Sequence, residues 1–478
     1  MLAPINRIPP EVLSLIPDSW NGRNKDRGVI ALTHVCRAWR EVFTSRSSLW
    51  TNFYCEDADK TRVYLERSKS SPIDVRIDQE GVLFPRDPLL QIIPLATSRL
   101  KSLHVKGSQD NIPDITSHLS HPAPLLEDLL IDGGCEFMPE KFPALAISLF
   151  DGDLSSLRKL RLKKVRTELP WRNMVNLTSF SLGYGSETEV SICGLLDFFE
   201  SAPRLREFNV ATPTPGPDAQ NGRLVSLTHL KTAKISPGEP PSILLAHLLI
   251  PVGAKLTTQA KVANSLIEAN LPRPSDNLRN FPDFTKVHAC AGPWFTHLRF
   301  SGPNGEFCMA FMSDRDHAGL VLETLAQLDT SKTEQLRYDW GDAIPGCSPY
   351  QALHPMNNLR TLTLYRFKNP NIFTCALHPG VGSSVVVCPK LEEIVIVLRI
   401  QEKGETLDMG RFVEMAAARA SGGAKLKSVG IFSRGEVEMD VSELAEHVLH
   451  VECGPDVPMT KFHDNKSGDE AGSSDEED

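Results

Sequence analysis

Leu157-Arg-Lys-Leu160-Arg-Leu162-Lys163 is the stretch that decides the fold. Its apolar residues stand at the first, fourth and sixth positions, with cations between them. Because alternate residues of a strand point to opposite faces, Leu160 and Leu162 share one face. The stretch therefore predicts a short strand that buries one face.

The same spacing recurs along the chain, and its first copies begin 20 to 31 residues apart. This scatter surrounds the period of about 20–29 residues that is typical of leucine-rich repeats. The clear copies are Leu100-Leu103-Val105, Leu126-Leu129-Ile131, Leu177-Phe180-Leu182, Leu205-Phe208-Val210, Phe295-Leu298-Phe300, Leu359-Leu362-Leu364, Leu391-Ile394-Ile396 and Leu426-Val429-Ile431. Segments between them, such as 194–200 and 411–419, have helical patterns.

The fold class that follows is α/β, with an irregular leucine-rich-repeat-like solenoid over residues 83–455 whose parallel strands alternate with helices. A doubly wound α/β domain is the alternative, but no nucleotide-binding loop accompanies the strands. The repeat fails between residues 227 and 295, and residues 228–294 are either degenerate repeats, which we favour, or an insertion.

Residues 1–55 have a different pattern and predict a small all-α module. A helix is expected to begin at Pro9-Pro10. Asn21 to Arg27 is predicted as a polar loop, and apolar residues recur at helical spacing from Val29 to Phe43. Residues 56–82 are expected to form a linking helix and a first strand, and residues 456–478 a disordered acidic tail.

Three segments of this module resemble the F-box motif, and their sequence is most similar to the large F-box families of mushroom-forming fungi. They are Ile8-Pro-Pro-Glu-Val-Leu13, Leu32-Thr-His-Val-Cys-Arg-Ala-Trp-Arg40 and Leu49-Trp50. The resemblance implies a three-helix F-box that docks on the Skp-type adaptor of a cullin–RING ubiquitin ligase. It assigns adaptor binding to Ile8, Pro9, Val12, Leu13, Ile16, Leu32, Val35, Cys36, Trp39, Leu49 and Trp50. The alternative is that the tryptophans only dock the module onto the following domain.

The formal net charge of −9 argues against a dedicated nucleic-acid binder. No apolar run is long enough for a bilayer, and the first residues lack a secretory pattern, so we expect no membrane partner. The ten cysteines are scattered, which is typical of reduced thiols in the cytoplasm and/or nucleus.

Motifs for nucleotide binding, zinc peptidases and serine hydrolases are absent from the sequence. The pairs His288/Cys290 and Cys375/His378, with Cys388, could be offered as zinc ligands, but scattered cysteines are more often core residues. We therefore expect no enzyme activity, no cofactor and no metal.

Cations gather at strand positions between the apolar residues, with six in residues 158–166. We assign target binding to Lys106, Lys159, Arg161, Lys163, Lys231, Arg299 and Arg337, for a target that is acidic or phosphorylated. The alternative is a solvated strand edge. The resemblance then implies the substrate-recognition subunit of an SCF ubiquitin ligase, which acts in ubiquitin-dependent protein degradation. The other possibility is a repeat scaffold with a vestigial F-box.

Overall fold

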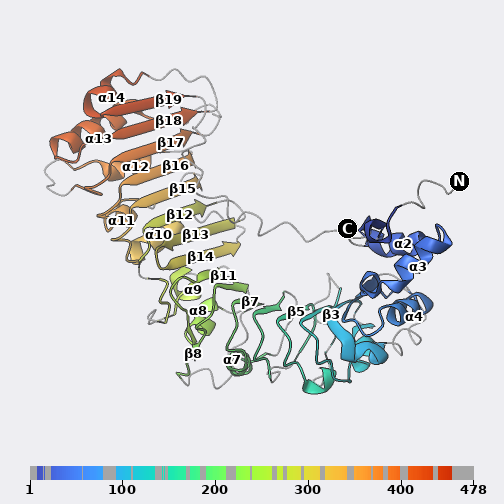
Figure 1. The fold of residues 1–478 in the computed structure, drawn as a ribbon. Coiled ribbons are helices and arrows are strands. Elements are labelled where there is room, and N and C mark those ends of the chain that lie inside the picture. Colours follow the sequence, from blue (N-terminus) through green and yellow to red (C-terminus); the bar gives the residue numbers. More distant parts are fainter. Residues whose placement is uncertain are drawn as a thin grey trace. The chain divides into compact units, whose positions relative to one another are not determined.

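The structure is a computed structural model (Figure 1). It describes residues 8–13, 15–16, 23–55, 57–78, 93–108, 111–134, 143, 145, 149–167, 173–183, 190–211, 222–236, 240–260, 266–272, 277–281, 283–291, 295–312, 318–341, 349–367, 370–380, 386–398, 407–433 and 440–454. The predicted acidic tail, 456–478, lies outside the described residues. The chain divides into two compact units, Met1–Leu230 with Glu477–Asp478, and Lys231–Glu476.

The first unit begins with short helices. They are α1 (Pro10–Leu13), α2 (Arg23–Leu32), α3 (Arg37–Ser45) and the 3-10 turn η3 (Ser47–Trp50). The polar loop predicted over Asn21 to Arg27 is wrong from Arg23 onward, because α2 begins there. The first turns of α2 consist of polar residues such as arginine, asparagine and lysine, which a helix tolerates. A prediction from the spacing of apolar residues cannot detect such a segment.

The helix expected through Phe43 is interrupted between α2 and α3. The Thr33 hydroxyl donates to the carbonyl of Ile30 at 2.7 Å, and Arg40 Nε donates to the Thr33 carbonyl at 2.9 Å. Cys36 has an extended backbone, with φ −161°. Side-chain hydrogen bonds to nearby carbonyls thus end one helix and hold the start of the next.

A parallel sheet forms the rest of the first unit. Its strands are β1 (Asn52–Tyr54), β2 (Ile73–Asp78), β3 (Leu100–Lys106), β4 (Asp128–Asp132), β5 (Lys159–Lys163), β6 (Ser179–Leu182) and β7 (Glu207–Ala211), paired in that order. The segments between carry α4 (Ala58–Arg67), η4 (Ile93–Arg99), α6 (Asn111–Ser117), η6 (Leu149–Gly152) and α7 (Ile192–Ser201), and β8 (Val225–Ser226) follows.

The repeated apolar positions are in register across this sheet. Leu103 pairs with Leu129, Leu129 with Leu160, Leu160 with Phe180, and Phe180 with Phe208. All five side chains are buried. The spacing of the sequence pattern therefore produces a stacked core, in which each repeat covers the apolar face of its neighbour.

The boundary expected at residue 55 differs from the observed one. β1 lies inside the range assigned to the all-α module, yet it pairs in parallel with β2. β2, expected in a linker, continues the same sheet through β3. The sheet therefore begins at Asn52 rather than at residue 83, because Phe53 and Val75 extend the stack of buried residues.

The second unit has a mixed sheet. Its strands are β9 (Thr232–Ser236), β10 (Leu248–Leu249), β11 (Lys255–Ala260), β12 (Lys286–Ala291), β13 (Phe295–Gly302), β14 (Gly305–Met312), β15 (Gln335–Gly341), β16 (Thr361–Phe367), β17 (Glu393–Leu398), β18 (Ser428–Ser433) and β19 (His450–Gly454). Its helices are α8 (Pro241–Leu245), α9 (Leu266–Asn270), α10 (Ala318–Gln327), α11 (Pro349–Leu353), α12 (Asn371–Leu377), α13 (Met409–Ser421) and α14 (Ser442–His447).

The pairing order β9-β11-β14-β13-β12-β15 explains why the repeat fails before residue 295. β9 and β11 are parallel, as two repeats would be. β12, β13 and β14 then form an antiparallel meander that doubles back, so that β14 rather than β12 lies beside β11. The described residues within 228–294 thus include two parallel, repeat-like strands, β9 and β11, followed by β12, the first strand of the meander. The copy at Phe295-Leu298-Phe300 is not a solenoid repeat, because its strand runs against both neighbours.

Regular parallel repeats resume from β15 to β19. Leu336, Leu362, Ile394, Val429 and Val451 are in register across them. Figure 1 shows α11 to α14 along the same side of these strands. This part is a mixed α/β, solenoid-like arrangement, as the spacing predicts.

Two strands of this part are buried on both faces. Val395, Val397 and Phe432 form an apolar cluster, with Tyr365 packed against it. A Cβ on Gly430 would stand 2.7 Å from the ring of Phe432, so this ring lies against the glycine. The alternation of apolar and exposed residues seen in β3 to β5 therefore stops at β17 and β18.

Candidate functional site

The residues that the F-box resemblance assigns to adaptor binding fall into three groups by exposure. Val12 and Val35 are half exposed, at 50% and 49%, and Pro9 is exposed. Ile8, Ile16 and Cys36 are partly buried. The buried members are Leu13, Leu32, Trp39, Leu49 and Trp50. Only the first two groups could meet a partner without rearrangement.

Trp50 joins the helical module to the linking helix. Its Nε1 donates to the carbonyl of Phe43 at 2.9 Å, and its ring meets Tyr64 edge-on at 4.9 Å. The guanidinium of Arg67 lies 4.3 Å from the centre of the Trp50 ring, within cation–π range. This residue has the docking role that the sequence left as an alternative.

Trp39 lies within the module. It packs edge-on against Phe43, with the ring centres 5.7 Å apart, and its Nε1 is buried without a hydrogen-bond partner. An unpaired buried N–H costs free energy, so Trp39 is held by packing alone.

The cations of β5 lie beside acids on one neighbouring strand, β4. Asp128 pairs in register with Lys159, and Asp132 with Lys163. Arg161 Nη2 donates to both oxygens of Asp128 at 3.2 Å. Lys106 is in register with Asp132. The basic row predicted here is therefore partly neutralised by Asp128 and Asp132 of the neighbouring strand β4.

The three cations assigned to the same row farther along the chain lie in the second unit. Arg299 is 3.4 Å from Glu306, and it stands on the antiparallel strand β13. Arg337 Nε donates to Asp339 at 2.6 Å. Lys231 is exposed and precedes β9. Arg299 and Arg337 are thus each paired with an acid of the second unit.

Another group of cations surrounds a hollow of about 310 Å³ in the first unit. The lining residues are Arg158, Asn176, Thr178, Arg204, Arg206 and His229, and we call this hollow the arginine groove. Its lining includes no carboxylate. Arg158 is one of the six cations of residues 158–166, whereas Arg204 and Arg206 were not predicted, because they precede strand β7 rather than lie in it.

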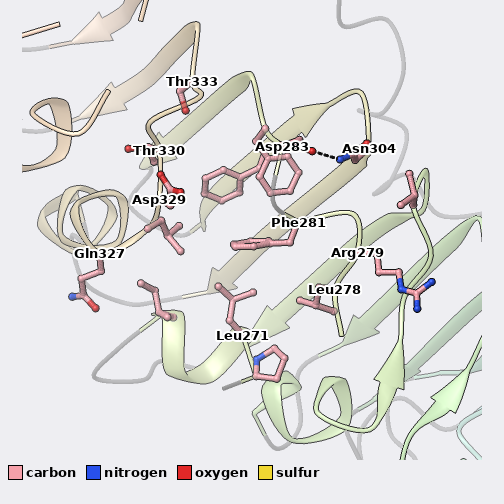
Figure 2. A pocket seen from close by; sticks show the side chains of 16 residues that line it. Leu271, Leu278, Arg279, Phe281, Asp283, Asn304, Gln327, Asp329, Thr330 and Thr333 are labelled. Carbon is pink, nitrogen blue, oxygen red and sulfur yellow. Dashed lines mark hydrogen bonds between the residues drawn. The ribbon is translucent and has the colours of Figure 1, made fainter. Parts of the chain in front are cut away.

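The second unit contains a larger pocket, of about 940 Å³ (Figure 2). Phe281 lies 5.2 Å from Phe284 and 5.5 Å from Phe307 between ring centres. Phe281 and Phe284 line the pocket together with Leu271, Leu278 and Phe300. Figure 2 shows Asp283 at the rim, where Asn304 Nδ2 donates to it at 2.5 Å. Lys332 also pairs with Asp283. The pocket is thus a mainly apolar hollow in which Asp283 is neutralised, and Arg279 and Asp329 also line it.

His288 and Asp339 form a half-buried pair on β12 and β15. His288 Nε2 lies 2.7 Å from Asp339 Oδ2. Burial alone would raise the pKa of Asp339, but hydrogen bonds from His288 and Arg337 bring it below its ordinary value. Burial and the Asp339 charge raise the pKa of neighbouring Cys290 to about 11. This thiol is therefore protonated at neutral pH and is a poor nucleophile.

Cys388, offered above as a zinc ligand, is buried and donates to the carbonyl of Leu353 at 3.4 Å. Burial raises the pKa of this thiol to about 12. Within the described ranges, no group of three or more His, Cys, Asp or Glu side chains could hold a metal ion. None of the described helices is both long and apolar enough to cross a membrane.

Comparison with protein-family models gives no match to this chain, and a search of curated proteins finds no similar sequence.

Proposed function

We propose that this chain is the substrate-recognition subunit of an SCF ubiquitin ligase. In this role, residues 1–55 bind the Skp-type adaptor, and through it a cullin, while the sheet binds the protein target. The observation that carries the proposal is the exposure of Val12 and Val35 on a module whose sequence resembles the F-box. Apolar side chains left half exposed on a small helical module are suited to a protein partner.

The chain itself supplies no chemistry in this proposal. Its target is an acidic or phosphorylated polypeptide, and ubiquitin transfer takes place elsewhere in the complex. Within the described part of the chain the cysteines form no disulfide, which fits a reducing compartment, the cytoplasm and/or the nucleus.

A second candidate is a binding scaffold whose helical module no longer engages an adaptor. The observation in its favour is the burial of Trp39, Leu49 and Trp50, which serve the first unit itself. Under this candidate the sheet binds a target, but no ubiquitin ligase assembles on the chain.

Co-expression of the full chain with a Skp-type adaptor and a cullin separates the two candidates. We expect the wild type to co-purify with both partners. A Val12→Glu, Val35→Glu double variant should lose them by at least about 10-fold, because each glutamate would be desolvated at the interface. Leu125→Glu is the matched control, since Leu125 is similarly exposed, at 45%, outside the helical module. Absence of the adaptor from the wild-type complex would favour the scaffold.

A further inference from the structure

The arginine groove is built by neighbouring strands. Arg158 immediately precedes β5, Thr178 precedes β6, and Arg206 precedes β7. The sheet hydrogen bonds extend to these residues, because Thr178 N donates to the Arg158 carbonyl and Arg206 N to the Thr178 carbonyl, both at 2.8 Å. With strands about 4.8 Å apart, the backbones of Arg158 and Arg206 lie about 10 Å from each other. Two guanidinium groups can thus reach one ligand between them.

The third arginine is held in place by a neutral partner. Arg204 Nη1 donates to Asn176 Oδ1 at 2.9 Å, and Asn176 Nδ2 donates to the Ser155 carbonyl at 2.8 Å. Asn176 therefore orients the guanidinium without cancelling its charge. The remaining N–H groups of Arg204 are available to a ligand.

The cations of the groove differ from others of the first unit in lacking acidic partners. Arg161 is paired with Asp128, and Arg223 with Asp197 and Glu200. Among the residues that the structure describes, Arg158, Arg204 and Arg206 have no ion pair. Three positive charges thus surround a hollow of about 310 Å³ without a carboxylate in its lining.

The charge of the groove selects the ligand. One carboxylate would leave about two of the three positive charges uncompensated. A phosphorylated side chain carries a charge of about −1.5 to −2 at pH 7, together with three acceptor oxygens. Guanidinium groups match such oxygens with paired hydrogen bonds. We propose that the arginine groove binds a phosphorylated serine or threonine side chain of a target polypeptide.

That this polypeptide is a ubiquitination target rests on the proposed function. Binding of the phosphate does not, since it needs only the first unit of the chain. Phosphopeptide binding is measured on the purified chain without an adaptor. Its result can therefore contradict the groove proposal without contradicting the ubiquitin-ligase proposal, and the reverse also holds.

Fluorescence anisotropy with a labelled nine-residue peptide tests the proposal. The probe has phosphoserine at its centre and alanine and glycine elsewhere, and its matched forms carry serine or glutamate at the centre. We expect the phosphoserine form to bind at least about 10-fold more tightly than either matched form. Its affinity should fall as NaCl is raised from 50 to 300 mM, because exposed charges are screened.

Glutamine substitutions locate the site. Arg158→Gln and Arg206→Gln should each weaken phosphopeptide binding about 10-fold or more, since each removes a charged hydrogen-bond donor. Lys101→Gln is the control, because Lys101 is an exposed cation on β3, outside the groove lining. All of these side chains are exposed, so the variants should keep the melting temperature of the wild type.

Three outcomes would overturn the proposal. One is equal affinity for the phosphoserine and serine peptides, and another is an equal loss of binding in Lys101→Gln and Arg206→Gln. The third is tighter binding of a single-stranded oligonucleotide of the same net charge, which would identify the groove as a site for phosphodiesters.

Discussion

Arg161 and Asp128 face each other across β5 and β4, with Arg161 Nη2 at 3.2 Å from both carboxylate oxygens. His104, on β3, lies 3.6 Å from the same carboxylate. Burial alone would raise the pKa of Asp128, but the hydrogen bond from His104 and the charge of Arg161 bring it below its ordinary value. The carboxylate therefore connects three neighbouring strands in its charged form.

Asp128→Asn should lower the free energy of unfolding at pH 7 by about 1–2 kcal/mol, since it weakens hydrogen bonds to charged groups that are partly exposed. The folded pKa of Asp128 lies below its unfolded value of about 3.9. Its contribution is therefore complete above about pH 4 and is lost as the pH falls through the folded pKa. Urea unfolding at pH 7 and pH 3 measures the difference in free energy of unfolding between wild type and variant. We expect this difference to be smaller at pH 3. An equal difference at both pH values would contradict this account.

Arg419, on α13, is a charged residue that is fully buried, and its role is structural. It donates from Nη1 to the carbonyl of Val387 at 2.7 Å and from Nη2 to the carbonyl of Cys388 at 2.8 Å. Arg419→Met roughly keeps the volume but removes the side-chain donor from both carbonyls. The Cys388 carbonyl keeps a hydrogen bond from Leu391 N at 3.0 Å, whereas the Val387 carbonyl loses the bond from Arg419, so we expect a loss of about 2–4 kcal/mol. Arg419→Lys should lose less, because an ammonium can satisfy one carbonyl at a time. Thermal unfolding of both variants checks the order, and equal losses would show that packing decides the effect.

Trp50 should be as important for the helical module as for the sheet beside it. Trp50→Ala removes a fully buried ring that packs on Tyr64, and we expect a cost of about 3–5 kcal/mol. Trp50→Phe keeps most of the packing and loses the hydrogen bond to Phe43, for about 1–2 kcal/mol. Hydrogen exchange should show lower protection of α2 and α3 in the alanine variant. Unchanged protection there would mean that the module folds without Trp50.

The repeat spacing predicted most of the strands, because a short strand with buried alternate residues leaves a direct mark on the sequence. It could not predict the direction of β13. Phe295, Leu298 and Phe300 have the same spacing as the parallel strands, and the spacing of apolar residues is the same in parallel and antiparallel strands. The antiparallel meander is therefore evident only from the observed strand pairing. Gly302 and Gly305 form the last pair before the turn between β13 and β14.

The candidate site was predicted less well than the fold, for a physical reason. The sequence places Arg161 in a row of cations, but the neighbouring strand brings Asp128 against it. Conversely, Arg158 and Arg206 are far apart in the chain and are brought together only by the stacking of β5, β6 and β7. The local net charge in a repeat array depends on which residues of neighbouring strands are in register. That register cannot be read from the spacing of residues within one strand.

The turn between β13 and β14 offers a test of the meander itself. Gly305 has φ +132°, and an added Cβ would lie 2.5 Å from the carbonyl oxygen of Ala254. Gly253 also has a positive φ, +85°, but an added Cβ would meet no atom within 4 Å. Gly253→Ala therefore carries only backbone strain, about 1 kcal/mol, whereas Gly305→Ala adds an overlap with backbone worth about 1–3 kcal/mol more. Hydrogen exchange should show reduced protection of β11, β13 and β14 in Gly305→Ala and much less change in Gly253→Ala. Equal effects of the two substitutions would mean that β14 does not approach β11 as closely as this pairing requires.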